Sequence, residues 1–180
     1  MSSESPIREE IELTTTSFIV LGLLAMAGEA TPYDLKQMVG ATVGNFWSLP
    51  HSQVYAEPER LARTGYLSEQ RESTGRRRRR YSLTDSGRAA FEQWLNVFTA
   101  EPYALRDLGL LKLFFGGDVH RLATAQVELH RSQLAEYEAI SQRAASGDMP
   151  QGPRLALELG IRHERETVHF WEEQLAPFDA

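Results

Sequence analysis

The segment that most restricts the fold is residues 66–84, "YLSEQRESTGRRRRRYSLT". Two short extended runs flank a turn that contains Gly75, a pattern that predicts a β-hairpin. In the second run Tyr81 and Leu83 have the same parity, so both are expected to face the core. The run from Arg76 to Arg80 then lies at the tip of the hairpin, where both faces are wet. Because neighbouring guanidinium groups repel one another, we expect the run to serve binding rather than folding.

Three helices are predicted before this hairpin and one after it. Capping residues mark the start of the first, second and fourth predicted helices, and Gly28 and Gly65 mark the ends of the first and third. The second helix has the clearest start, because Thr31 is followed by Pro32 and then by Asp34 at the capping-box position. In the third helix Val54, Pro58 and Leu61 share one face. The predicted helices cover residues 18–27, 32–40, 50–64 and 85–98, the last with a stripe of Phe91, Leu95 and Phe98.

This order of elements predicts a mainly α protein whose N-terminal part is a winged helix-turn-helix with a two-stranded β-wing. We place this domain at residues 1–98, with residues 1–13 as a polar N-terminal arm. Residues 99–180 read as one short apolar helix followed by two long helices, from Asp118 and from Arg154. Three helices enclose little apolar surface by themselves. We therefore expect residues 99–180 to form a C-terminal helical dimerisation domain in a two-fold homodimer.

Charge is unevenly distributed along the chain. The formal net charge is -6, yet residues 60–80 carry eight arginines against Glu69 and Glu72. A local basic patch of this kind suits a polyanion such as DNA. The alternative for the arginine run is an ordinary solvated charge run. Its position at the tip of a wing, beside the third helix, favours contact with the phosphates that flank a groove.

Several other classes of function are disfavoured by the sequence. The chain has no cysteine, which excludes disulfides and thiolate metal sites. The longest apolar run, residues 18–27, is about half of the ~20 residues that cross a bilayer. The segment "HERETVH" departs from the zinc-protease pattern, and no serine elbow or phosphate loop is present. We therefore expect a cytoplasmic protein that is not an enzyme, with no catalytic residue, metal or cofactor and no membrane partner.

The chain resembles the PadR family of bacterial transcriptional regulators. The resemblance is carried by "SFIVLGLLA", "TPYDLKQM", "FWSLPHSQVYAEPERLARTGYL", "RRRRRYSLTDSGRAAFEQWL" and "YALRDLGLLKLFFGG". Together these segments cover roughly residues 16–117, and the two long helices that follow fit the family's dimerisation region in length and order. "SQVY", the Gly-Tyr-Leu step into the wing and "YSLTDSGR" are the most specific parts.

The resemblance implies a homodimeric repressor that binds a double-stranded, pseudo-palindromic DNA operator. The third helix is then expected to enter the major groove, and the wing to reach the backbone or minor groove. Gln53 suits bidentate pairing with adenine, although Glu57 and Glu59 interrupt the DNA-facing side of this helix. The positions expected to contact DNA are Tyr33, Lys36, His51, Ser52, Gln53, Tyr55, Arg76, Arg77, Arg78 and Arg79.

The resemblance also implies a small hydrophobic or aromatic effector near the dimer interface. Its expected pocket residues are Trp94, Phe98 and Trp171, for which the alternative is a place in the dimer core. A second hypothesis for the whole protein is a winged-helix interaction module that grips an acidic protein partner. The cluster of hydrogen-bonding residues at the start of the third helix favours DNA.

Overall fold

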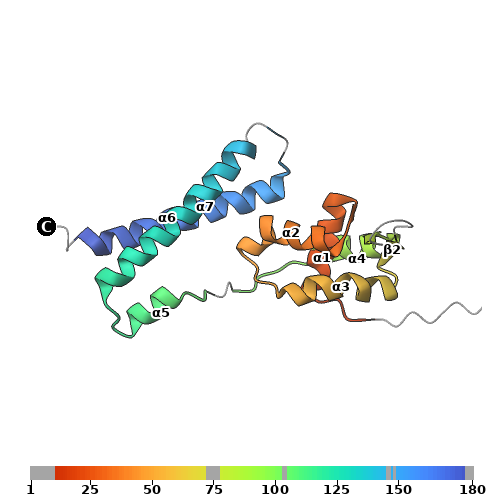
Figure 1. Ribbon diagram of the computed structural model, residues 1–180, viewed down its shortest axis with the longest axis horizontal. Coiled ribbons are helices and arrows are strands. Elements are labelled where there is room, and N and C mark those ends of the chain that lie inside the picture. The colour runs from red at the N-terminus through yellow and green to blue at the C-terminus, as the bar shows by residue number, and fades with distance from the viewer. Residues whose placement is uncertain (1–10, 72–77, 103–104, 145–146, 148, 177–180) are drawn as a thin grey trace, which may run out of the picture. The chain divides into compact units, whose positions relative to one another are not determined.

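The computed structural model describes residues 11–71, 78–102, 105–144, 147 and 149–176 (Figure 1). Contacts divide the chain into two compact units, Met1–Ala100 and Glu101–Ala180. Each unit is described by itself below. The expectation of a mainly α protein with a winged helix-turn-helix and a C-terminal helical part is confirmed.

The first unit follows the predicted order of three helices, a hairpin and a helix. A single-turn 3-10 helix, η1, lies in the connection between the second and third helices. The elements are α1 (Thr15–Ala27), β1 (Glu29–Ala30), α2 (Pro32–Ala41), η1 (Val43–Asn45), α3 (His51–Arg63), β2 (Leu67–Arg71), β3 (Arg79–Leu83) and α4 (Asp85–Leu95).

The helices of the first unit begin and end where local chemistry requires. Thr14 and Thr31 each accept a hydrogen bond from the third backbone N–H of the helix that follows, and both helices have a complete capping box. Thr84 caps α4 in the same way, by accepting from the N–H of Gly87. Gly28 and Gly65 follow α1 and α3 with φ of 78° and 82°, a conformation that glycine adopts without a Cβ clash. The predicted stops at both glycines are confirmed.

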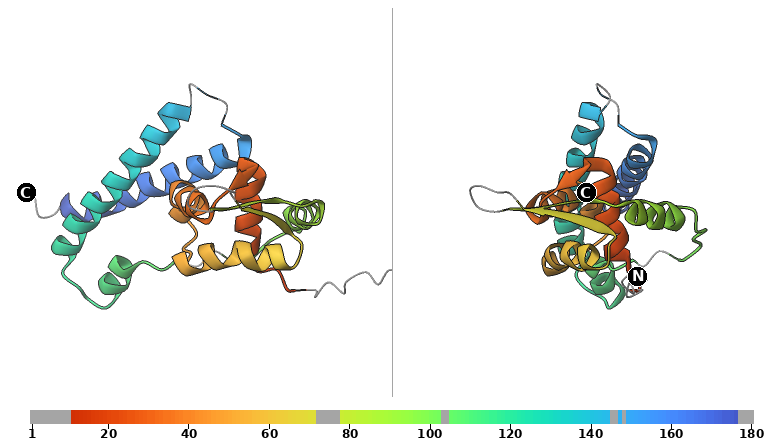
Figure 2. Two further views of the ribbon diagram at one scale, coloured as in Figure 1. Left: turned by 45° about the vertical axis from the view of Figure 1, so that its right-hand side comes forward. Right: turned by 90° about the vertical axis from the view of Figure 1, so that its right-hand side faces the viewer.

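The wing belongs to a three-stranded antiparallel sheet rather than to an isolated hairpin. The strand order is β1-β3-β2, with Ala30 opposite Tyr81 and Leu67 opposite Leu83. Figure 2 shows β2 and β3 running side by side along the helices of this unit. The two-stranded expectation missed β1, because a strand of two residues is too short to produce an alternating pattern.

The core of the first unit forms where α1 packs against the other helices and the sheet. Its buried members come from α1, β1, α2, α3, β2 and β3, so every strand of the sheet is anchored in one cluster. Tyr81 is buried in this cluster and Leu83 packs against it, which confirms their predicted orientation.

The predicted stripe on α4 is wrong beyond Phe91. The helix ends at Leu95, and Phe98 lies outside it with 90% of its side chain exposed.

The second unit consists of three helices: α5 (Leu108–Phe114), α6 (Val119–Ala144) and α7 (Gln151–Leu175). The two long helices pack along each other around Trp171, Ala123 and Val127. Asp118 caps α6 as predicted, through the N–H of Arg121. The last helix begins three residues earlier than expected, because Pro153 lies in its first turn, where a missing N–H is harmless. Among the described residues, no helix is long and apolar enough to cross a membrane.

Candidate nucleic-acid interface

Helix α3 has one buried side and one exposed side. Val54, Pro58 and Leu61 are buried, as predicted from their spacing. The four residues expected to read DNA at the start of this helix are all exposed: His51, Ser52, Gln53 and Tyr55. Because a helix turns every 3.6 residues, burying one side against α1 leaves these polar side chains on the outside.

Two further predicted contacts come from α2, which packs against α3. The side chain of Tyr33 is exposed, and its hydroxyl accepts a hydrogen bond of 2.7 Å from Gln37 Nε2. Lys36 is half-buried. A tyrosine hydroxyl that already accepts from Gln37 keeps its own O–H free to donate to a phosphate oxygen.

The arginines of the wing differ in how much of their charge is free. Arg78 is exposed, whereas Arg76 and Arg77 lie outside the described residues. Arg79 forms an ion pair of 3.0 Å with Glu59 of α3 and a longer one of 3.7 Å with Glu69 of β2. This partner set competes with the predicted role of Arg79 as a phosphate ligand, which stays a prediction.

Glu69 collects several donors at the base of the wing. It accepts from Arg71 Nε at 2.8 Å and from the Tyr81 hydroxyl at 3.1 Å. The hydrogen bond from Arg71, helped by Tyr81 and by the charge of Arg79, holds the pKa of Glu69 below its usual value despite some desolvation. The carboxylate therefore stays charged and ties β2 to β3.

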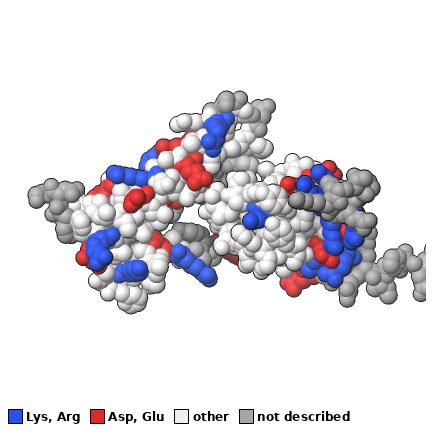
Figure 3. Space-filling model, viewed as in Figure 1, with Lys and Arg blue, Asp and Glu red and all other residues white. Residues whose placement is uncertain are grey.

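Arg80 forms an ion pair with a residue of β1, a strand that the sequence did not predict. Its Nη1 lies 3.1 Å from Glu29 Oε1. The pairing was missed because β1 itself was missed. Figure 3 shows Lys and Arg side chains gathered at the end of the first unit that carries the wing, with acidic side chains among them.

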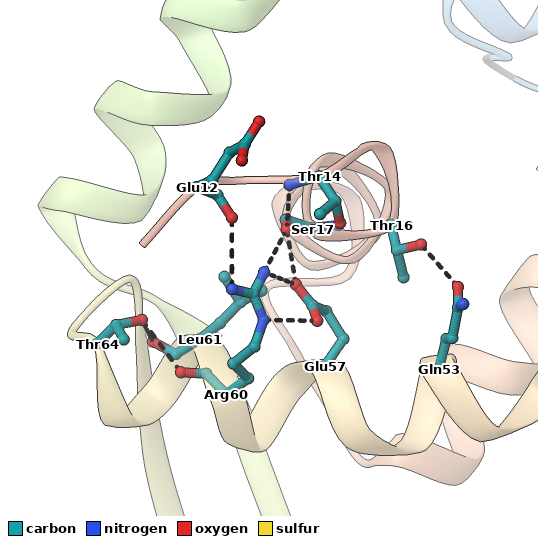
Figure 4. A network of polar contacts seen from close by, with 9 residues as sticks. All are labelled: Glu12, Thr14, Thr16, Ser17, Gln53, Glu57, Arg60, Leu61 and Thr64. Atoms are coloured by element: carbon teal, nitrogen blue, oxygen red, sulfur yellow. Dashed lines mark hydrogen bonds and ion pairs between the residues drawn. The ribbon is translucent and has the colours of Figure 1, made fainter. Parts of the chain in front are cut away.

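A correction concerns Glu57, which was expected to interrupt the DNA-facing side of α3. Its side chain is buried on the side that faces α1 (Figure 4). It accepts from the Ser17 hydroxyl at 2.6 Å and from Arg60 at 2.6 and 2.9 Å. Desolvation raises the pKa of Glu57, but the hydrogen bonds from Arg60 and Ser17 outweigh it and lower the pKa overall. Because this carboxylate faces the core, it does not repel phosphates.

The sequence reasoning did not single out Arg60, Ser17 or Thr16, which connect α1 to α3. Arg60 Nη2 also donates to Ser17 Oγ at 2.9 Å, and Nη1 donates to the Glu12 carbonyl at 3.4 Å, so α1 and the arm are both tied to α3. Thr16 Oγ1 donates to Gln53 Oε1 at 3.1 Å. The helical position of Glu57, three residues after Val54 and four before Leu61, was the signal that could have placed it toward the core.

The three residues expected to line an effector pocket lie in different settings. Trp94 is 40% exposed and stacks on Phe18 with ring centroids 4.8 Å apart. Phe98 is exposed in the same unit. Trp171 is 1% exposed and fills the core of the second unit. Because Trp171 is fully packed, it lines no open pocket in the second unit as described, and the effector pocket stays a prediction.

Each of the two units matches the model of a known protein family. Residues 20–93 match the model of the transcriptional regulator PadR-like family, and residues 105–178 match that of the virulence activator alpha C-terminal region. The negative transcriptional regulator PadR of Bacillus subtilis is 27% identical over 176 residues, which are 90% of this chain and 96% of that protein.

The fold is also that of solved structures. The crystal structure of Bacillus subtilis PadR in complex with operator DNA matches with a TM-score of 0.79 and 26% identity, over 92% of this chain and 99% of that one. The structure of the same protein in complex with p-coumaric acid matches with a TM-score of 0.71 and 24% identity, over 93% of this chain and 98% of that one. A winged helix with an exposed polar recognition helix, followed by a matching helical unit, therefore identifies this chain as a member of the PadR-like family of transcriptional regulators.

Proposed function

We propose that this protein is a homodimeric repressor that binds a specific DNA operator and is released by a small hydrophobic or aromatic effector. The observation that carries the proposal is the exposed polar start of α3, beside a wing that ends in arginines. The related PadR of Bacillus subtilis is a negative regulator and has been crystallised on operator DNA. Such a protein acts in the cytoplasm, where the chromosome lies.

Two kinds of contact divide the work of DNA binding. Ser52, Gln53 and their neighbours at the start of α3 read base edges in the major groove. Lys36 and the wing arginines neutralise phosphates, and Tyr33 donates a hydrogen bond to one. These contacts supply affinity without sequence preference. If each protomer neutralises about four phosphates, log K falls against log salt with a slope of about -7 for the dimer.

The second unit supports the proposal of a dimer. Phe114 is 80% exposed and Leu159 is 70% exposed, and Leu108, Leu111, Phe115 and Leu155 are also largely exposed. Apolar side chains gathered on so small a unit are typical of an interface that a partner covers. A second copy is the partner proposed, because a two-fold axis also sets two α3 helices on two half-sites about 34 Å apart.

An effector acts on this arrangement by preferring one dimer geometry. A ligand that binds better to a spacing unlike that of the half-sites shifts the population away from the DNA-bound form. The complex of Bacillus subtilis PadR with p-coumaric acid makes phenolic acids the first class to try.

A gel-shift experiment tests the proposal. We expect the protein to shift duplex DNA from the region upstream of its own gene, in the presence of excess unrelated competitor DNA. We expect p-coumaric acid or a related phenolic acid to release it. Absence of any shift at low salt contradicts DNA binding and favours the acidic protein partner instead.

A further inference from the structure

Gln53 is the base-reading candidate on α3 whose side chain is held by another helix. Its Oε1 accepts a hydrogen bond of 3.1 Å from the hydroxyl of Thr16, in the first turn of α1 (Figure 4). Among the described residues no other hydrogen bond reaches the Gln53 side chain, so Nε2 keeps both of its N–H groups for DNA. The hydroxyl thus fixes which end of the amide points at α1 and which is left for a base.

The position of Thr16 is itself fixed by the buried contact next to it. Ser17, the following residue of α1, donates to Glu57 at 2.6 Å, and Glu57 lies one helical turn after Gln53 on α3. Arg60 bonds to both Ser17 and Glu57 and completes this buried connection. Consecutive residues of α1 therefore contact successive turns of α3, one pair buried and the other at the surface.

A pre-arranged side chain loses less conformational entropy when it meets its target than a free one does. An exposed glutamine ordinarily samples many rotamers, and its amide presents either end to a base. With Oε1 held by Thr16, donors rather than acceptors are offered preferentially to the base edge. We infer that Thr16 is a positioning residue that orients Gln53 and so sets the base preference of α3. This inference rests on the proposed function, because it requires that α3 reads DNA.

Binding-site selection from a duplex library with a randomised centre tests the inference. The proteins compared are wild type, Thr16→Val, Thr16→Ser and Gln53→Ala. Valine keeps the shape of threonine without the donor, and serine keeps the hydroxyl. Thr15→Val is the matched control, since among the described residues the side chain of Thr15 makes no hydrogen bond.

We expect Thr16→Val and Gln53→Ala to lose discrimination at the same base pair of each half-site, by roughly threefold to tenfold for the loss of one hydrogen bond. Thr16→Ser and Thr15→Val keep the wild-type preference. The salt dependence on the selected duplex stays that of wild type for Thr16→Val, because no cationic side chain is removed.

Three results overturn the inference. One is a Thr16→Val protein with wild-type preference at the base pair that Gln53→Ala affects. Another is an equal loss of affinity for all sequences, which makes Thr16 a contact to the DNA backbone. The third is a Gln53→Ala protein with unchanged preference. A wild-type protein that selects no sequence instead refutes the proposed function, so the two failures are distinguishable.

Discussion

Glu57 is the residue whose surroundings most change the interpretation of α3. By charge alone it belongs to the surface, where carboxylates are normally found. Its helical position places it between Val54 and Leu61 on the buried side. Its partner Ser17 lies 40 residues away, a pairing that only the packing of α1 on α3 creates. Local patterns predicted the caps at Thr31 and Thr84, whose partners lie within three residues, and missed this cross-helix network for the same reason.

Replacing this carboxylate is expected to destabilise the first unit. In Glu57→Gln the charge-assisted bonds from Arg60 and Ser17 become weaker neutral ones and the Arg60 cation loses its counter-charge, at a cost of about 1–3 kcal/mol. Urea denaturation measures the free energy of unfolding. Glu59→Gln is the control on the same helix, since its half-exposed ion pair with Arg79 contributes about 0–1 kcal/mol. Equal stability of the two variants contradicts a structural role for the buried network.

The same group makes an expected contribution to acid sensitivity. The pKa of Glu57 lies below its ordinary value of 4.5 in the folded state. The folded protein therefore holds fewer protons than the unfolded chain at mildly acidic pH, and stability falls as the pH drops from above 4.5 through the folded pKa. Urea midpoints across this range are expected to fall more steeply for wild type than for Glu57→Gln. Parallel pH profiles contradict the assignment.

At the scale of elements, local sequence signals were sufficient to predict the helices but not to predict all strands of the sheet. Capping residues and positive-φ glycines fixed where α1, α2 and α4 begin and where α1 and α3 end. Pairing of β1 with β3 depends on Gly28 turning the chain back beside Ser82, which a reading of β1 alone does not reveal. The ion pair between Arg80 and Glu29 follows from that pairing.

Gly87 shows how closely α4 approaches the step into β2. A Cβ at this position lies 2.1 Å from the Tyr66 carbonyl oxygen, inside any allowed contact. We expect Gly87→Ala to destabilise the first unit by about 1–3 kcal/mol, because α4 must move away from the backbone of Tyr66. Gly40→Ala is the control, since its added Cβ meets nothing within 4 Å and removes unfolded-state entropy within α2. Thermal melts are expected to move in opposite directions, with Gly40→Ala stabilising by about 0.5–1 kcal/mol. A neutral Gly87→Ala contradicts the close approach.

The junction of α3 and the wing predicts opposite effects on DNA affinity for two exposed charges. Glu59→Gln removes a negative charge from α3 and frees Arg79 from its nearer partner, so binding to any duplex is expected to tighten with a steeper salt slope. Arg78→Ala removes an exposed cation and is expected to weaken binding to all sequences, with a slope shallower by about 1 per protomer. Titration of a labelled duplex at several salt concentrations measures both. An unchanged affinity of Glu59→Gln contradicts the competition of this carboxylate for Arg79.

At the scale of the whole molecule, the sequence predicted two helical parts but not which surfaces they present. Val168, Trp171 and Leu175 on α7 pack inward. Leu155 and Leu159, one turn apart on the same helix, do not share in that packing and are exposed. A period of apolar residues indicates that a face is covered and does not indicate whether the same chain or a second copy covers it.

This distinction makes α7 the place to test the proposed dimer. In Leu159→Glu a charge replaces an apolar side chain that is 70% exposed in the single chain, so the fold tolerates it while a buried subunit interface does not. Sedimentation is expected to give the mass of one 20.3 kDa chain for the variant and twice that mass for wild type. Because a dimer engages two half-sites at once, affinity for the selected operator is expected to fall about 100-fold or more, while the weak binding of one winged helix persists. Glu166→Gln, an exposed change on the same helix, is expected to leave both unchanged. A Leu159→Glu protein that stays dimeric moves the subunit contact to the other exposed apolar side chains, those of α5 around Phe114.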